Sequence, residues 1–356
     1  MMITFRDIIN QKSWTRYEDF ISEGIKHYTD NLSNELQHGK ALKSKIREYL
    51  EKHFEIKKIS QDLDDVKQLL TCGEVIGIDG TVAQHKTVTG IMAQIGVVAV
   101  NYLNEKIKHS YFISEAKYKE DIDDVVNYLF SHEPQAKIIS NLVIRAMLLY
   151  REREIGLREE FKDKIKLYHG PLLPFELMSD LGKLRALNTT LEILEKIIRN
   201  KKCISIISRS QNDAYIRLGL SLNPGEYIMH HKSLGVELIE DSNLVSHKEK
   251  WREEDLLKIN SFLQSEANQI RIGIIKISKR PYVFHAYHEN FDLAANIIAA
   301  DSKFQKEKGF PLLIDYADSL CSSFFKASDF NKIIEYQLAK EGEFLSETSE
   351  EMLRQK

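Results

Sequence analysis

The pattern of apolar and polar positions predicts a change from helix to strand near residue 73. Residues 1–72 are polar and highly charged, and Leu42, Ile46, Leu50 and Phe54 recur every four positions, as on one face of an amphipathic helix. From residue 74, apolar runs follow at 74–79, 91–100 and 107–113, as in adjacent strands of a sheet. We therefore expect a helical N-terminal extension over 1–72, which packs either on its own domain or on a partner.

Helical and strand patterns alternate in the rest of the chain. Helices are predicted at 122–130, 141–160, 179–200, 291–307 and 312–325, and strands at 164–168, 203–208, 272–277 and 282–287. Residues 213–260 give mixed signals. Three consecutive strands followed by this alternation predict the α/β class, with a ribonuclease-H-like mixed sheet flanked by helices over 73–330. Residues 331–356 are expected to form an acidic C-terminal tail.

Composition narrows the class of protein. The chain is 43% hydrophobic and 29% charged, which is typical of soluble globular proteins, and its net charge of −3 excludes a uniformly basic nucleic-acid coat. Cys72, Cys203 and Cys321 are far apart and form no Cys-x-x-Cys pair, so we expect a reducing cytoplasm rather than zinc or disulfides. The apolar run at 91–100 is too short to span a bilayer, and the N-terminus soon becomes charged, so neither a secretory signal nor membrane contact is expected.

Two carboxylates stand where a strand end and a late helix could meet. Asp79 ends the apolar strand 74–79, and Asp318 flanks the apolar side of the helix that begins at Pro311. Two-metal phosphodiester cleavage draws carboxylates from separated parts of a chain to hold cations about 4 Å apart. Mg²⁺ and Mn²⁺ accept such oxygen ligands. Asp315 competes with Asp318 one turn earlier, and a turn aspartate or a solvated aspartate is the alternative for each.

Several short segments follow one another in a distinctive order. They are Ile76-Gly-Ile-Asp-Gly-Thr, the helix containing Arg145, His169-Gly-Pro-Leu, Ser208-Arg-Ser, and Gly309-Phe-Pro with Tyr316-Ala-Asp. They cover about residues 74–325, and their order, more than any single motif, resembles the NurA nuclease family. The resemblance implies a ribonuclease-H-like fold and a Mn²⁺ or Mg²⁺ cofactor.

The resemblance also implies a set of metal ligands. Its first and last positions fall on Asp79 and Asp318, and the aspartate before Gly-Pro-Leu is replaced here by His169, which can still bind Mn²⁺ through a neutral imidazole. The glutamate of the long helix falls near Leu149, so Glu152 from the next turn is the first replacement.

Two further glutamates compete for that last position. Glu154 continues the apolar stripe of the long helix, and Glu115 stands just after the third strand. A solvated charge run is the alternative for the helical glutamates. Glu152 ranks first because it is nearer the position that the resemblance indicates.

Basic residues near strand ends are candidates for phosphate contacts. Arg209 ends a strand, while Lys276, Lys279 and Arg280 flank the strand pair at 272–287. Tyr282, Phe284 and Tyr287 lie among them and are candidates for base stacking, although Tyr282 and Phe284 share a face that favours core packing. His285 and His288 lack further ligands for zinc. Neither a Walker-type phosphate loop nor a Gly-x-Ser-x-Gly elbow is present.

These features lead to the hypothesis of a Mn²⁺- or Mg²⁺-dependent deoxyribonuclease. The family resemblance implies a homodimer that docks on a hexameric HerA-type ATPase and acts on DNA in end processing or anti-phage defence. One alternative is a NurA-like adaptor that binds DNA and the ATPase without cutting, because the positions of His169 and Leu149 depart from the family pattern. A third interpretation is a ribonuclease that acts on RNA.

Overall fold

This computed structural model describes Glu18 and residues 25–87, 90–115, 140–179, 185–210, 212–240 and 252–341. The helix predicted at 122–130 lies outside these ranges. The chain divides into two compact units, 1–53 and 54–356. The first unit contains the long helix α3 (Ile25–His53), which confirms a helical N-terminal segment. Phe54, the last member of the predicted stripe, lies beyond the end of this helix.

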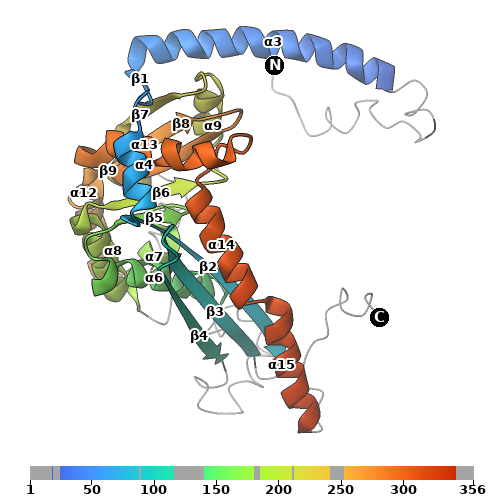
Figure 1. The fold of residues 1–356 in the computed structure, drawn as a ribbon, viewed down its shortest axis with the longest axis vertical. Helices are drawn as coiled ribbons and strands as arrows, with labels where there is room; N and C mark the ends of the chain where they lie inside the picture. The colour runs from blue at the N-terminus through green and yellow to red at the C-terminus, as the bar shows by residue number, and fades with distance from the viewer. Residues whose placement is uncertain are drawn as a thin grey trace. The chain divides into compact units, whose positions relative to one another are not determined.

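The second unit is built on one mixed sheet (Figure 1). Within the described residues the sheet has nine strands, in the order β1-β7-β8-β9-β6-β5-β2-β3-β4. Their bounds are β1 (Ile56–Lys58), β2 (Val75–Thr87), β3 (Gly90–Val100), β4 (Lys106–Ser114), β5 (Ile165–His169), β6 (Cys203–Ile207), β7 (Glu226–Ser233), β8 (Ile270–Lys276) and β9 (Pro281–Tyr287). Strand β5 pairs in parallel with β2 and β6, whereas the other pairings are antiparallel. The predicted mixed sheet is therefore confirmed.

Helices cover both faces of this sheet. The helices of the second unit are α4 (Asp64–Thr71), α6 (Asn141–Gly156), α7 (Phe175–Met178), α8 (Leu187–Asn200), α9 (Asp213–Leu220), α10 (Leu234–Glu240), α12 (Glu253–Gln264), α13 (Phe291–Ser302), α14 (Leu312–Phe324) and α15 (Ala327–Lys340). Apolar side chains of α4, α13 and α14 form one core with the sheet. Helices α6 and α8 pack on the other side, and Figure 1 shows α14 lying along β2.

Three parts of the chain differ from the sequence-based expectation. Strand β7 lies inside the stretch with mixed signals, because its outer end bulges between Met229 and Ser233 and breaks the alternation. Residues 54–72 do not belong with α3, since β1 pairs with β7 and α4 packs on α13. Residues 327–340 form α15 on β2, with Phe330 buried, so the part of the predicted tail up to Lys340 is a packed helix.

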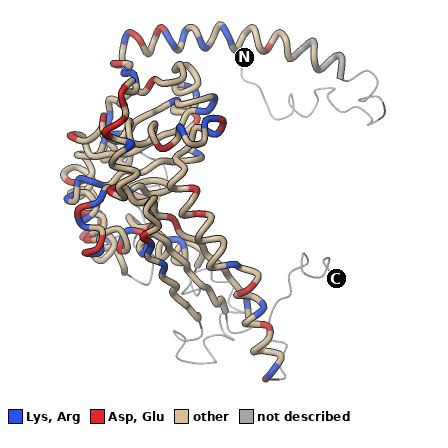
Figure 2. Tube along the Cα trace, viewed as in Figure 1, with Lys and Arg blue, Asp and Glu red and all other residues tan. Residues whose placement is uncertain are grey.

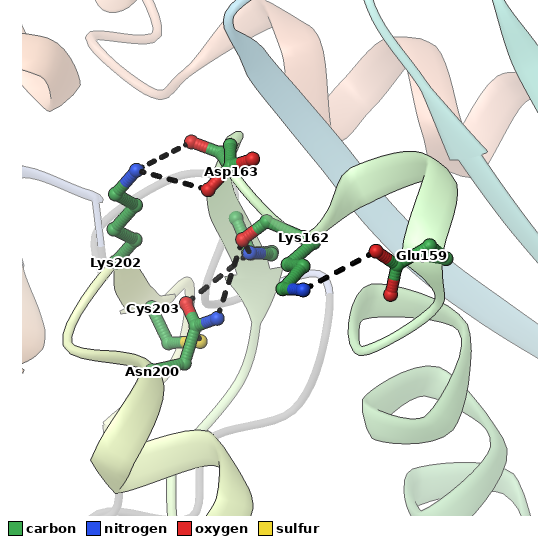
Figure 3. Close-up of polar contacts among 7 residues, drawn as sticks. Glu159, Lys162, Asp163, Asn200, Lys202 and Cys203 are labelled. Atoms are coloured by element: carbon green, nitrogen blue, oxygen red, sulfur yellow. Dashed lines mark hydrogen bonds and ion pairs between the residues drawn. The ribbon is translucent and has the colours of Figure 1, made fainter.

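A buried ammonium group joins the amino ends of β5 and β6 to the end of α8. Lys166 is fully buried, and its Nζ donates to the Lys162 carbonyl at 2.9 Å and to Asn200 Oδ1 at 3.2 Å. Burial lowers the pKa of this lysine. Figure 3 shows Asn200 between Lys162 and Cys203, with Lys202 reaching Asp163 beside them. This network stabilises the amino ends of β5 and β6, whereas the candidate active site lies at their carboxyl ends.

The buried position of His285 predicts that the free energy of unfolding depends measurably on pH. Burial in β9 lowers its pKa from 6.5 to about 4, and its Nδ1 accepts the Leu172 N–H at 3.3 Å. The unfolded chain binds the proton near pH 6.5 and the folded chain only near pH 4. The free energy of unfolding should therefore fall between these values as the pH is lowered, by up to about 3 kcal/mol from this group.

Urea unfolding at several pH values measures this effect as a difference between variants. His285→Gln keeps an acceptor for the Leu172 N–H but cannot titrate, so its loss of stability toward pH 4 should be smaller than that of the wild type. His288→Gln is the matched control, because His288 is exposed three residues away. If the free energy of unfolding falls equally steeply with pH in His285→Gln and in His288→Gln, the prediction is wrong.

None of the helices within the described residues combines the length and the apolar character needed to cross a membrane.

Candidate active site

Asp79 lies at a step in the sheet. The pairing of β2 with β5 ends at Ile78 and Tyr168, whereas β2 continues along β3 to Thr87. Asp79 follows directly after this last pair and is 6% exposed. Its Oδ1 accepts the Gly80 N–H at 3.0 Å and lies 3.5 Å from Nδ1 of His169, the last residue of β5. The end of β5 thus brings His169 beside Asp79, which lies within β2 and not at the end of a strand as predicted.

Two glycines beside Asp79 allow helices to approach β2 closely. A Cβ on Gly77 would lie 2.5 Å from the Leu313 carbonyl oxygen of α14. A Cβ on Gly80 would lie 2.5 Å from the Leu148 side chain and 3.0 Å from Glu152 Oε1, both on α6. Because residues 77 and 80 face opposite sides of the strand, α14 and α6 approach from opposite faces of the sheet.

Helix α14 brings Asp318 toward Asp79. The Cys321 thiol donates to the Asp79 carbonyl oxygen at 3.1 Å, and Asp318 stands three residues earlier on the same helix. The start of α14 is fixed by Asp301, which accepts the Leu313 N–H at 2.9 Å. Partial burial and then the negative charge of Asp79 raise the pKa of Asp318. The two predicted carboxylates, far apart in sequence, are therefore close enough for their charges to interact.

His169 is oriented by groups on both sides of its ring. Its Nε2 lies 2.9 Å from Ser208 Oγ, just after β6, and its Nδ1 faces Asp79. Phe310 packs edge-on against the ring, with centroids 5.8 Å apart. The hydrogen bond to Asp79 and the neighbouring carboxylates raise the pKa of His169, and this increase outweighs the effect of burial. The imidazole is therefore held near negative charge in a fixed orientation.

Glu152 enters the site from α6 as a buried acid. It is 3% exposed, and its Oε2 accepts from Arg153 at 2.7 Å. Arg153 is fully buried and also donates to the Pro171 carbonyl oxygen at 2.6 Å. Burial and the negative charge of Asp79 raise the pKa of Glu152 to about 7, against the opposing effect of the Arg153 guanidinium. A carboxyl group with this pKa can exchange a proton near neutral pH.

The side chains around Asp79 are of types that bind a hard divalent cation. They do not stand close enough together, however, to form a complete metal site. Carboxylate oxygens and one imidazole suit Mn²⁺ or Mg²⁺, and a nearby cation would relieve the repulsion that raises the pKa of Glu152 and Asp318. Adjacent ligands of an octahedral ion are about 3 Å apart, which is close to the Asp79–His169 distance. Nevertheless, no three potential ligands in the described part of the chain stand close enough to hold an ion.

Other acidic candidates have different roles. Glu154 forms an ion pair with Arg151 at 2.7 Å and accepts from the Tyr111 hydroxyl of β4 at 3.5 Å. Glu115 accepts the Ile91 N–H at 3.0 Å, at the hairpin end of β2 and β3, several residues along the strands from Asp79. Asp315 pairs with Lys308. Of the glutamates predicted from sequence, Glu152 is the one whose charge couples to Asp79.

The predicted phosphate-binding residues separate into exposed and buried groups. Arg209 follows β6 directly after Ser208 and is exposed, and Arg280 is exposed in the turn between β8 and β9, with its guanidinium 5.7 Å from the Tyr282 ring. Lys276 is buried, and its Nζ donates to the Leu220 and Leu222 carbonyl oxygens at 3.0 and 2.8 Å. A phosphate contact by Lys276 therefore does not fit the structure, because the alternation of β8 turns this side chain inward.

The three aromatic candidates for base stacking pack in the core instead. Tyr282, Phe284 and Tyr287 are buried at 5% exposure or less. Along the described part of the second unit, basic and acidic residues alternate along the trace (Figure 2).

Three residues that shape the site have no role predicted from the sequence. Ser208 and Phe310 occur only as parts of resembling segments, although a hydroxyl directly after a strand parallel to β5 could have been placed beside His169. Arg153 gave no signal, because a cation inside a charged run is common in surface segments.

The combination of a mixed sheet, helices on both faces and acidic side chains at the β2–β5 step defines a ribonuclease-H-like α/β protein. No protein-family model matches the sequence. No curated protein matches it either. Among solved structures, the crystal structure of the NurA nuclease from Sulfolobus solfataricus aligns with a TM-score of 0.53 and 11% identity, over 91% of this chain and 97% of that chain.

A crystal structure of NurA bound to dAMP and manganese aligns with a TM-score of 0.48 and 10% identity, over 88% of this chain and 96% of that chain. The chain thus has the fold of the NurA nuclease, as the sequence resemblance implied.

Proposed function

We propose that this protein is a divalent-metal-dependent nuclease that hydrolyses phosphodiester bonds in DNA. The observation that carries the proposal is that the charges of Asp79, Glu152, His169 and Asp318 influence one another near the step where β5 ends and β2 continues. The NurA-type fold supports it. Mn²⁺ and Mg²⁺ are the proposed ions, since the donor set combines carboxylates with one imidazole.

Each side chain has a distinct proposed role. Asp79 and Asp318 are the oxygen ligands, and His169 adds a nitrogen ligand through Nδ1, with Nε2 held by Ser208. A bound ion would polarise the phosphate and favour ionisation of the attacking water. Glu152 can hold or release a proton at Oε1, because Arg153 occupies Oε2 and the pKa lies near 7.

A second candidate function is an adaptor with this fold that binds DNA without cutting it. It is favoured by the absence of three donors at ligand spacing within the described residues and by the ion pair that engages Glu152. The replacement of an aspartate of the family pattern by His169 also lowers the negative charge available to hold cations.

The proposed partners are DNA, a second copy of this chain and a hexameric HerA-type ATPase. They come from the family resemblance. A translocating ATPase would feed DNA to the nuclease, which then needs only modest affinity of its own, in keeping with the net charge of −3. DNA end processing and anti-phage defence are both compatible with such a pair, and we propose the cytoplasm as its location.

A nuclease assay on the purified full-length chain tests the proposal. We expect DNA to be cut in Mn²⁺, with or without the ATPase, and to remain intact when EDTA is present. DNA binding without cutting under all these conditions would support the adaptor instead. Replacing the DNA by RNA of the same sequence tests the ribonuclease interpretation.

A further inference from the structure

The junction between α13 and α14 contains a buried carboxylate that takes no part in the proposed chemistry. Asp301, in the last turn of α13, is fully buried. One of its oxygens accepts the Leu313 N–H of α14 at 2.9 Å, and the other accepts from the Tyr102 hydroxyl. Burial raises the pKa of this carboxyl group to about 6, because its negative charge is poorly solvated there. Its place in the fold therefore points to the two hydrogen bonds rather than to apolar packing.

The first turn of α14 depends on Asp301 for a capping contact. The residue before this helix is Pro311, which has no side-chain oxygen, and an N–H in the first turn has no partner within its own helix. The carboxylate of Asp301 accepts the Leu313 N–H from the neighbouring helix and places a negative charge at the positive end of the helix dipole. Helix α13 therefore sets the point at which α14 begins.

The turn between β3 and β4 is tied to the same junction. Tyr102 in this turn donates to Asp301, and the Tyr316 hydroxyl of α14 donates to Asn104 Oδ1 at 3.2 Å. The turn is itself well fastened, because the buried Asn101 side chain accepts the N–H four residues later at 3.0 Å. The start of α14 is thus bonded both to α13 and to the sheet.

Helix α14 contacts β2 at two points on either side of Asp318. A Cβ on Gly77 would lie 2.5 Å from the Leu313 carbonyl oxygen, and the Cys321 thiol donates to the Asp79 carbonyl oxygen at 3.1 Å. A displacement of the first turn of α14 would therefore move the Asp318 carboxylate relative to that of Asp79. Functional groups must be held within about 0.5 Å of their productive geometry, so a small displacement is enough to matter.

We propose that Asp301 is a positioning residue for the candidate active site, which sets the place of Asp318 relative to Asp79 by capping α14 from α13. This inference rests on the proposed nuclease function. Asp301 touches neither substrate nor ion and acts only through the Leu313 N–H. The site needs an acceptor at this position, so asparagine should replace the aspartate, whereas an apolar residue of similar size should not.

Thiol labelling of the full-length chain in EDTA tests the position of α14 without catalysis. Cys321 lies on α14, and Cys203 is the first residue of β6. Burial raises the pKa of both thiols, so each reacts only when its surroundings open. We expect Asp301→Leu to speed the labelling of Cys321 by about tenfold or more, the effect of losing one hydrogen bond to a carboxylate, and to leave Cys203 unchanged. Mass spectrometry assigns the label to each cysteine.

Two variants are the controls for Asp301→Leu. Asp301→Asn keeps the acceptor and should label at Cys321 as slowly as the wild type. Asp292→Leu removes another carboxylate of α13 that accepts from a tyrosine hydroxyl, but at the other end of the helix, and should also leave Cys321 unchanged. The inference would be overturned by a wild-type labelling rate in Asp301→Leu, by equal acceleration at Cys203 and Cys321, or by equal rates in Asp301→Asn and Asp301→Leu.

A milder variant keeps the acid and removes one of its donors. Tyr102→Phe leaves Asp301 with the Leu313 N–H alone, so the labelling of Cys321 should accelerate by a smaller factor than in Asp301→Leu. This variant decides the matter if Asp301→Leu does not fold. Labelling of Cys321 at the wild-type rate in Tyr102→Phe would then count against the inference.

Cleavage in Mn²⁺ relates the position of α14 to the proposed activity. Asp301→Leu should raise the Mn²⁺ concentration for half-maximal cleavage by about tenfold, the lower end of the effect of losing a supporting contact at a metal site, and Asp301→Asn should not. An unchanged Mn²⁺ dependence in Asp301→Leu would contradict the positioning role. Absence of cutting by the wild type would instead count against the proposed nuclease, and the thiol rates would still decide whether Asp301 holds α14.

Discussion

Asp79→Asn is expected to reduce Mn²⁺-dependent DNA cleavage by about 10²-fold or more. Asparagine keeps an oxygen acceptor for the Gly80 N–H but removes the negative charge at the centre of the acidic cluster. Loss of an outer partner of a metal ligand typically costs 10- to 100-fold in activity or metal affinity, so loss of a ligand's charge should cost at least the upper part of this range. Initial rates on a labelled oligonucleotide measure the effect.

The control for this variant is Asp163→Asn. Asp163 lies on the surface with its side chain 92% exposed, so the same chemical change there should leave the cleavage rate unaltered. Thermal unfolding of both variants checks that the fold is intact. Equal cleavage by wild type and Asp79→Asn would remove Asp79 from the mechanism.

The Arg153→Met variant is expected to lose about 3–5 kcal/mol of unfolding free energy, the cost typical of removing one partner of a buried ion pair. Arg153 is fully buried, and its loss would leave Glu152 without its cation and the Pro171 carbonyl without its donor. Methionine retains much of the apolar volume of the arginine stem. Urea unfolding followed by circular dichroism provides the measurement.

The same helix offers a matched ion pair at its surface. Arg151 pairs with Glu154 at the same distance of 2.7 Å, with side chains that are 30% and 40% exposed, so Arg151→Met should cost no more than about 1 kcal/mol. The double variant Arg153→Met with Glu152→Gln should recover part of the loss, because it removes the stranded charge. Equal losses of unfolding free energy in Arg153→Met and Arg151→Met would contradict a special role for the buried ion pair.

Much of the fold follows from local sequence patterns. Strands β2, β3, β8 and β9 contain apolar runs, and α14 begins after Pro311 with a clear apolar face. Strand β7 could not be predicted, because its bulge and polar outer end suppress the period of two. Helix α15 was predicted only as a tail, since just Phe330 of its length is buried.

The site was accessible from sequence only in part. Asp318 was predicted from its place on a helix flank and Glu152 from its distance to the family position, whereas Asp79 was predicted at a strand end but lies within β2, which continues to Thr87. The contacts that decide the role of each group depend on tertiary packing. Neither the burial of Arg153 behind Glu152 nor the inward turn of Lys276 can be derived from spacing along the chain.

The two glycines on β2 have a consequence for the interpretation of mutational scans. A side chain at Gly77 would meet the backbone of Leu313 and push α14, which carries Asp318, away from the strand, whereas one at Gly80 would first displace the Leu148 side chain of α6. A saturation library scored by activity would therefore mark Gly77 as the more intolerant of the two, even though neither glycine has a side chain that could take part in chemistry. Such a map would reflect the spacing between layers, and it would distinguish catalytic groups only when protein abundance is scored beside activity.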